Sequence, residues 1–208
     1  VGGVAANGIG VSDFWRTMIE GRSGVGPITL FDASKLPNRI AAEVRGFDPA
    51  SHLPAAVKWK RMARHTQFAL AALDMALSDA ALGGCIADAS RPVSVTIGVS
   101  TSAIEVVEGV AQDLVRGEDC KFRPWLVWSS QPHSVTTTLA EHVGARVAYQ
   151  TVSTACKAGA DAVLAAVAAI RAGRSDIAIA GGADASITAT TCTAFCAGKM
   201  LSSRNDDP

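Results

Sequence analysis

The sequence has few charges and few aromatic residues for its 208 residues, and its charges cancel. Charged residues make up 18% and aromatic residues 5%, and 19 Lys and Arg offset 19 Asp and Glu. Nucleic-acid binding rests on clustered positive charge, so no nucleic-acid partner is expected. The longest apolar stretch, residues 158–170, is too short to cross a bilayer, so no membrane span is expected either. Apolar residues still make up 49%, which is enough to build a core.

Histidine is scarce, and cysteine does not occur in a disulfide-like or zinc-like pattern. No histidine follows His142, and the five cysteines are an odd number at irregular spacings. Cys192 and Cys196 fit one helix face, but no nearby histidine completes a tetrahedral zinc site, so no metal is expected. The N-terminal glycines lack the dinucleotide-binding spacing, and no cofactor is expected. With no signal peptide in these residues, we expect a cytoplasmic protein.

The stretch around Cys156 carries the strongest chemical signal. Residues 146–152 are apolar and β-branched, which predicts a strand, and residues 157–172 are rich in Ala and Val, which predicts a helix. Cys156 then lies on the turn between them, beside the positive end of the helix, where a thiolate is favoured. The alternative is that Cys156 is a small buried apolar residue, as free cysteines often are.

Alternating strands and helices predict α/β layers with a mainly parallel sheet. Further strands are expected at residues 92–100 and 175–182, the second of the buried parallel type. The helix over residues 157–172 is apolar almost all round and is expected to be buried on every side. At the N-terminus, Ser12 is expected to cap a helix that Gly21 ends. His65 is expected to be structural.

Three motifs in order, Thr154-Ala155-Cys156, Gly181-Gly182-Ala183-Asp184 and the segment LSSRNDDP at residues 201–208, resemble those of the β-ketoacyl synthases. The resemblance implies a thiolase-like layered fold, with this chain as the N-terminal half of an α/β/α/β/α sandwich. It also implies that residues 1–208 are an N-terminal domain truncated at both ends. The C-terminal half, which carries two catalytic histidines and a lysine in the family, is absent.

The same resemblance implies a reaction. Cys156 takes an acyl group from acyl carrier protein, whose phosphopantetheine arm carries the acyl and malonyl groups. Decarboxylative Claisen condensation with malonyl-acyl carrier protein then extends the chain in fatty-acid or polyketide biosynthesis. Without the second half, the chain by itself is expected to condense nothing. Lys157 departs from the family pattern; its ammonium either lowers the pKa of the cysteine or points to solvent.

Three more residues match family positions that contact substrate. Thr101 matches one that faces the acyl chain, or else caps a helix. Leu126 lies in the bulky segment 121–130, which the family places near the subunit interface and the partner's acyl pocket; burial in the core is the alternative. Phe195 matches a residue that lines or gates the acyl pocket, or else is a core aromatic residue. The family implies a homodimer or a ketosynthase-like heterodimer.

Two other functions remain open within the same fold. Ketosynthase-like chain-length factors are non-catalytic partner subunits that lose the nucleophile, and the presence of Cys156 counts against this reading. Thiolases use coenzyme A thioesters. The residues of the Thr154-Ala155-Cys156 and SSRNDDP motifs favour the enzymes that use acyl carrier protein instead. An α/β-hydrolase is disfavoured because no Gly-x-nucleophile-x-Gly pattern surrounds Cys156.

Overall fold

A three-stranded parallel sheet forms the centre of the computed structural model, which describes residues 1–83, 86, 91–117, 124–144 and 147–206. Its strands are β5 (Val93–Gly98), β6 (Val147–Val152) and β7 (Ile177–Gly182), in the order β6-β5-β7. Val93 lies opposite Val147 on one side and Ile177 on the other. The predicted strands and their parallel pairing are therefore confirmed.

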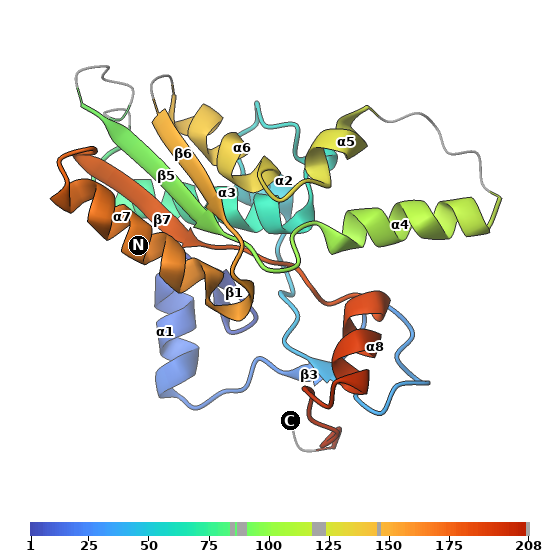
Figure 1. The fold of residues 1–208 in the computed structure, drawn as a ribbon. Coiled ribbons are helices and arrows are strands. Elements are labelled where there is room, and N and C mark those ends of the chain that lie inside the picture. The colour runs from blue at the N-terminus through green and yellow to red at the C-terminus, as the bar shows by residue number, and fades with distance from the viewer. Residues whose placement is uncertain (84–85, 87–90, 118–123, 145–146, 207–208) are drawn as a thin grey trace.

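Helices cover both faces of this sheet (Figure 1). On one face lies α7 (Ala158–Arg171), and on the other lie α3 (Arg64–Asp79) and α6 (Ser134–Val143). Every residue of β5 is buried, because the strand has a neighbour on each side and a helix layer on each face. The main core joins apolar residues of β5 to those of α3 and α6, including Val95, Leu70 and Leu139.

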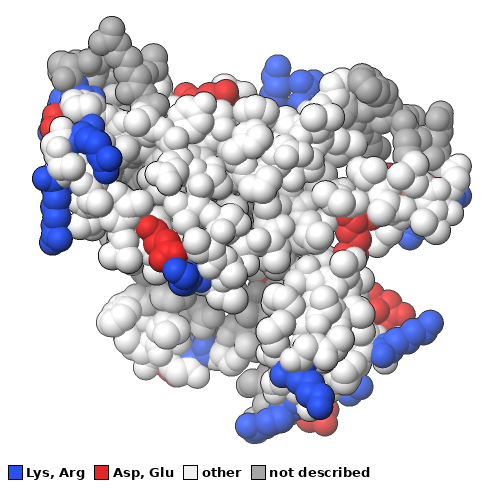
Figure 2. Space-filling view, in the orientation of Figure 1, with Lys and Arg blue, Asp and Glu red and all other residues white. Residues whose placement is uncertain are grey.

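The helix α7 forms where it was predicted, but it is buried on one face only. Ala158, Ala162 and Ala166 repeat every fourth residue and are buried against the sheet. The prediction of burial on every side is wrong for the chain as described. The outward apolar side chains remain exposed: Val163, Leu164, Val167 and Ile170. Figure 2 shows a largely uncharged surface on this side of the molecule.

Glycines let α7 approach the sheet closely. A Cβ on Gly98 would lie 2.2 Å from the carbonyl oxygen of Ala158, and a Cβ on Gly182 would lie 3.0 Å from the Cα of Gly159. The close approach predicted for the glycine pair therefore holds for Gly182. The full burial predicted for β7 is wrong: its residues are half-buried or exposed, because among the described residues β7 has a strand neighbour on one side only.

The N-terminal region is a small antiparallel hairpin, β1 (Val4–Ala5) and β2 (Gly8–Ile9), followed by α1 (Val11–Ile19). Gly10 occupies the N-cap, so Ser12 lies inside the helix, and the predicted Ser12 cap is wrong. Gly21, at a φ of 66°, follows the helix end as expected.

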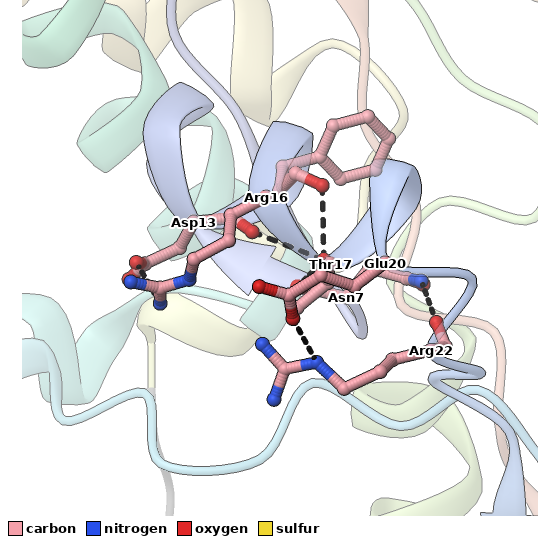
Figure 3. A network of polar contacts seen from close by, with 7 residues as sticks. Asn7, Asp13, Arg16, Thr17, Glu20 and Arg22 are labelled. Carbon is pink, nitrogen blue, oxygen red and sulfur yellow. Dashed lines mark hydrogen bonds and ion pairs between the residues drawn. The ribbon is translucent and has the colours of Figure 1, made fainter.

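Polar contacts hold α1 to the segments around it (Figure 3). The Thr17 hydroxyl donates to the Asn7 carbonyl at 2.5 Å, and the Asn7 amide donates to the Arg22 carbonyl at 3.1 Å. Two ion pairs, Arg16 with Asp13 and Arg22 with Glu20, each measure 2.6 Å. The apolar side chains of α1 include Trp15, which is 64% exposed. The two bonds of Asn7 tie α1 and the segment after it to the hairpin, whereas both ion pairs are local and exposed.

The remaining elements surround this core. They are β3 (Gly26–Pro27), β4 (Ile40–Ala41), α2 (Pro49–His52), the 3₁₀ turns η1 (Trp59–Arg61) and η2 (Ala155–Lys157), α4 (Ile104–Val115), α5 (Trp125–Ser129) and α8 (Ala189–Ala197). Within the described ranges, no helix combines the length and apolar character that crossing a membrane requires.

The motif near the end of the chain contacts a loop far earlier in sequence. The Asn38 amide donates to the Ser202 carbonyl at 2.8 Å. Asn205 accepts from the Arg39 amide at 2.7 Å and donates to the Pro37 carbonyl at 3.0 Å. Asn38 of the loop and Asn205 of the motif thus tie the described part of the C-terminal segment to residues 37–39. Residues 207–208 of the motif lie outside the described residues.

Candidate active site around Cys156

The turn after β6 presents Cys156 to solvent. β6 ends at Val152, η2 covers Ala155–Lys157, and α7 begins at Ala158. Cys156 is a free, exposed thiol in this turn. The predicted strand-turn-helix setting is confirmed over the described residues (Arg146 lies outside them), and Cys156 is not the buried apolar residue of the alternative reading.

The start of α7 supplies the electrostatic setting for this thiol. The first amides of a helix lack partners within the helix, and the helix of 14 residues carries its positive dipole end there. Cys156 lies two residues before Ala158, so this positive end is next to it. The Ala158 N–H is hydrogen-bonded to the Ala155 carbonyl, which leaves the earlier amides of the turn as the candidate donors. An exposed thiol at a helix start is a setting in which a thiolate can attack a carbonyl carbon and amides can stabilise the resulting oxyanion.

Lys157 is paired rather than free. Its ammonium lies 2.9 Å from Oδ2 of Asp161, one turn later on α7. The same oxygen accepts the Thr154 hydroxyl at 2.5 Å. The Thr154 hydroxyl and then Lys157 hold the pKa of the Asp161 carboxyl below its usual value. The Lys157 side chain is 71% exposed, in agreement with the expectation that it points to solvent. Its pairing with Asp161 was not predicted, although the i, i+4 spacing of the two residues is a signal for it.

Thr101 lies in the turn between β5 and α4, which Asp184 holds. The Asp184 carboxylate accepts the backbone N–H groups of Ser100, Thr101 and Ser102 at 2.8, 2.9 and 2.9 Å. The Thr101 hydroxyl also lies 3.3 Å from this carboxylate and hydrogen-bonds with the Ser186 hydroxyl. Its polar atom is therefore engaged within the protein. Asp184 ends the Gly181-Gly182-Ala183-Asp184 motif, but the sequence does not predict its bonds to this turn.

The Thr101 turn and the Cys156 turn leave the same edge of the sheet. β5 and β6 are parallel neighbours with Gly98 opposite Val152, and the Val99 amide donates to the Val152 carbonyl at 2.9 Å. The structure thus brings these two predicted site segments to one edge.

Leu126 and Phe195 lie on other elements. Leu126 is half-buried in the short helix α5, which packs against α6 and η1. Phe195 is half-buried in α8, where a helix was predicted. Neither residue lines the cavities formed by α3, α4 and the start of α8, and no hydrogen bond found among the described residues joins either one to Cys156. Their assignment to an acyl pocket stays a prediction, and residues 121–123 of the bulky segment lie outside the described residues.

A cavity of about 550 Å³ lies away from Cys156, among α3, α4 and the segment leading into α8. Its lining includes Arg64, Glu105, Glu108 and Asp184. Burial raises the pKa of Glu105, whose Oε1 accepts the Arg64 amide at 2.8 Å. The arrangement is structural: Glu105 caps the first turn of α3, which has no side-chain cap of its own.

The other described cysteines do not resemble Cys156. Burial raises the pKa of the Cys192 thiol, and Cys196 is half-buried. Cys85 and Cys120 lie outside the described residues. No group of three or more His, Cys, Asp or Glu within the described ranges is arranged to hold a metal ion.

Known proteins share both the sequence and the fold. The model of the β-ketoacyl synthase N-terminal domain matches residues 1–208. A putative polyketide β-ketoacyl synthase 1 from Streptomyces cyaneus is 39% identical, and 3-oxoacyl-[acyl-carrier-protein] synthase 2 from Synechocystis is 32% identical. Each match covers 100% of this chain and 50% of the relative, so the chain spans about half the length of these curated relatives.

Solved structures agree. The ishigamide ketosynthase/chain length factor matches with a TM-score of 0.84 and 30% identity, over 97% of this chain and 50% of the other. A β-ketoacyl synthase from Burkholderia phymatum matches with a TM-score of 0.86 and 25% identity, over 100% of this chain and 50% of the other. The predicted α/β fold, the N-terminal half of a ketosynthase, is thereby confirmed.

Proposed function

The chain belongs to the β-ketoacyl synthase family, and on that premise we propose that Cys156 is its acyl-accepting nucleophile. The exposed Cys156 thiol at the start of α7 is the observation that carries this proposal. In the proposed first step the thiolate attacks the carbonyl carbon of an acyl thioester on acyl carrier protein. The phosphopantetheine thiol leaves, and the acyl group stays on Cys156.

The proposed second step is condensation. A malonyl thioester loses carbon dioxide, its enolate carbon attacks the carbonyl of the acyl-Cys156 thioester, and the Cys156 thiolate is released. The backbone N–H of Cys156 is a candidate donor to the oxyanion in both steps. The further donors that decarboxylation needs are proposed to lie in the part of the relatives that this chain does not span. We therefore expect the chain alone to accept acyl groups without condensing them.

Exposed apolar surfaces support an assembly larger than this chain. The outward face of α7 is proposed to pack against the second half of the longer protein. On the side of α4 and α5, Leu114, Val115, Val127 and Trp128 are 43–89% exposed, and we propose a subunit interface there. The solved relatives include a ketosynthase/chain length factor and a type II polyketide acyl-carrier protein in complex with its ketosynthase. A homodimer or a ketosynthase-like heterodimer is proposed on this basis.

The test is labelling of the purified chain. It is incubated with an acyl-acyl carrier protein and, separately, with cerulenin, a cysteine-directed ketosynthase inhibitor, and adducts are located by mass spectrometry. We expect a single adduct on Cys156 that Cys156→Ala abolishes and Cys196→Ala, the matched control, retains. An unmodified Cys156, or equal labelling of all cysteines, contradicts the proposal.

A further inference from the structure

The residue before Cys156 has a backbone conformation that its own side chain disfavours. Ala155 has a φ of 56°, in the left-handed region that favours glycine. For a residue with a Cβ this conformation is strained, because the Cβ lies too close to the following carbonyl oxygen. Neighbouring contacts must therefore hold the turn, because the sequence of the turn does not favour it.

One carboxylate oxygen contacts both sides of this turn. Oδ2 of Asp161 accepts the Thr154 hydroxyl at 2.5 Å, and the Lys157 ammonium lies 2.9 Å from it. Thr154 directly precedes Ala155, and Lys157 directly follows Cys156. Asp161 itself lies in the first turn of α7, where the helix fixes its backbone. The two contacts thus enclose the two residues Ala155 and Cys156.

We propose that Asp161 is a positioning residue for the nucleophile, which holds the turn from Thr154 to Lys157 so that the Cys156 thiol faces solvent at the start of α7. This inference rests on the proposed role of Cys156 as the acyl acceptor. Thr154 supplies the hydrogen bond that orients the entry to the turn, and Lys157 supplies an ion pair on its exit. Asp161 touches neither substrate nor the reacting atoms and acts only through this turn.

A rescue experiment separates positioning from general stability. If Asp161 serves to hold Ala155 at positive φ, then glycine at position 155 removes the need for it, because glycine adopts that region without strain. Asp161→Asn combined with Ala155→Gly should then recover what Asp161→Asn alone loses. A general loss of stability would leave the double variant as impaired as the single one.

The first measurement is acylation of Cys156 by a short-chain acyl N-acetylcysteamine thioester, followed by intact-protein mass spectrometry. Asp161→Asn is expected to lower the maximal rate about tenfold, as displacing a reacting group by a fraction of an ångström does, with an unchanged half-saturating concentration. Thr154→Ser is expected to retain more of the rate than Thr154→Val, since it keeps the hydroxyl. The Asp161→Asn/Ala155→Gly variant is expected to recover most of the loss.

Wild-type rates in Asp161→Asn, or no recovery in the double variant, overturn the proposal. If the wild-type chain takes no acyl group, the proposed function is contradicted but the role of Asp161 is not. Hydrogen exchange of residues 154–158 then tests the role of Asp161. Exchange there is expected to quicken in Asp161→Asn and Thr154→Val while β5 stays protected. Unchanged exchange in residues 154–158 rejects the role of Asp161 by itself.

Discussion

Two turns leave the same edge of the sheet, and each has a non-glycine residue at positive φ that is held by a different kind of contact. Each contains a non-glycine residue at positive φ, Ser102 at 54° after β5 and Ala155 at 56° after β6. Each is held by an aspartate from a later segment, Asp184 for the first turn and Asp161 for the second. The first turn is buried at Ser102, whereas the second leaves Cys156 exposed.

The difference lies in what each carboxylate contacts. Asp184 accepts three consecutive backbone N–H groups, so it holds the β5 turn whatever side chains that turn carries. Asp161 contacts only side chains, those of Thr154 and Lys157, and it leaves the backbone amides of the turn unused. If the second turn offers amides and a thiol to a substrate, as proposed above, holding it through its side chains leaves those amides available.

Substitution of Gly98 tests how far the two turns depend on one shared contact. Gly98 ends β5, and a Cβ there would lie 2.2 Å from backbone atoms of Ala158, the first residue of α7. Gly98→Ala is expected to destabilise the chain by about 3 kcal/mol or more, because neither backbone can give way cheaply. Urea unfolding followed by circular dichroism measures this loss.

Gly181→Ala is the matched control for that substitution. It also changes a glycine in a strand of the same sheet, but a Cβ there meets nothing within 4 Å. Its stability should stay close to that of the wild type. If both variants unfold alike, the contact between β5 and α7 does not join the two turns.

The dependence of stability on pH tests the burial of His65, whose pKa is influenced by Asp184. His65, on α3, is fully buried, and neither ring nitrogen has a hydrogen-bond partner among the described residues. Burial lowers the pKa of His65 to about 4, with a smaller opposing effect of the Asp184 charge. Between pH 6.5 and 4 the unfolded chain binds the proton and the folded chain does not. Stability is therefore expected to fall as pH falls through this range, by on the order of 3 kcal/mol.

Urea unfolding from pH 7 to pH 4 measures this loss, with His65→Gln as the control that removes the titrating group.

Glu105 has the opposite effect on stability in acid, because burial raises its pKa and the folded chain keeps the proton to a higher pH than the unfolded chain does. A Glu105→Gln variant should therefore lose stability more steeply in acid than the wild type. A flat profile in the Glu105→Gln variant, where Glu105 no longer opposes the effect of His65, would contradict the prediction.

Removing the carboxylate of Asp184 tests whether the first turn depends on it. Asp184→Ala leaves three N–H groups without their acceptor, and because Asp184 is exposed, water replaces part of what is lost. We expect a loss of about 1–2 kcal/mol. Hydrogen exchange at Ser100, Thr101 and Ser102 should quicken, while exchange at residues 154–158 stays unchanged. Quickened exchange at both turns would show that they move together.

The sequence was sufficient for the elements and insufficient for the contacts that hold the turns. β5, β6, β7 and α7 followed from apolar pattern and small-residue content, and the exposed cysteine followed from the strand-turn-helix order. The sequence could not predict which face of α7 is buried, because a helix that is apolar all round does not indicate which neighbours cover it. The bonds from Asp184 reach back more than 80 residues, and no local pattern predicts such a partner.

The smallest effect is expected at Lys157, and it separates the two contacts of Asp161. The Lys157 side chain is 71% exposed, and exposed ion pairs contribute little to stability because water screens them. Lys157→Met should therefore leave both the midpoint of thermal unfolding and the exchange rates at residues 154–158 at their wild-type values, since the Thr154 bond remains. A fall of several degrees, or rapid exchange in that segment, would show that the cation holds the second turn. The turn after β6 would then be held by an ion pair, whereas the turn after β5 is held by hydrogen bonds from its backbone.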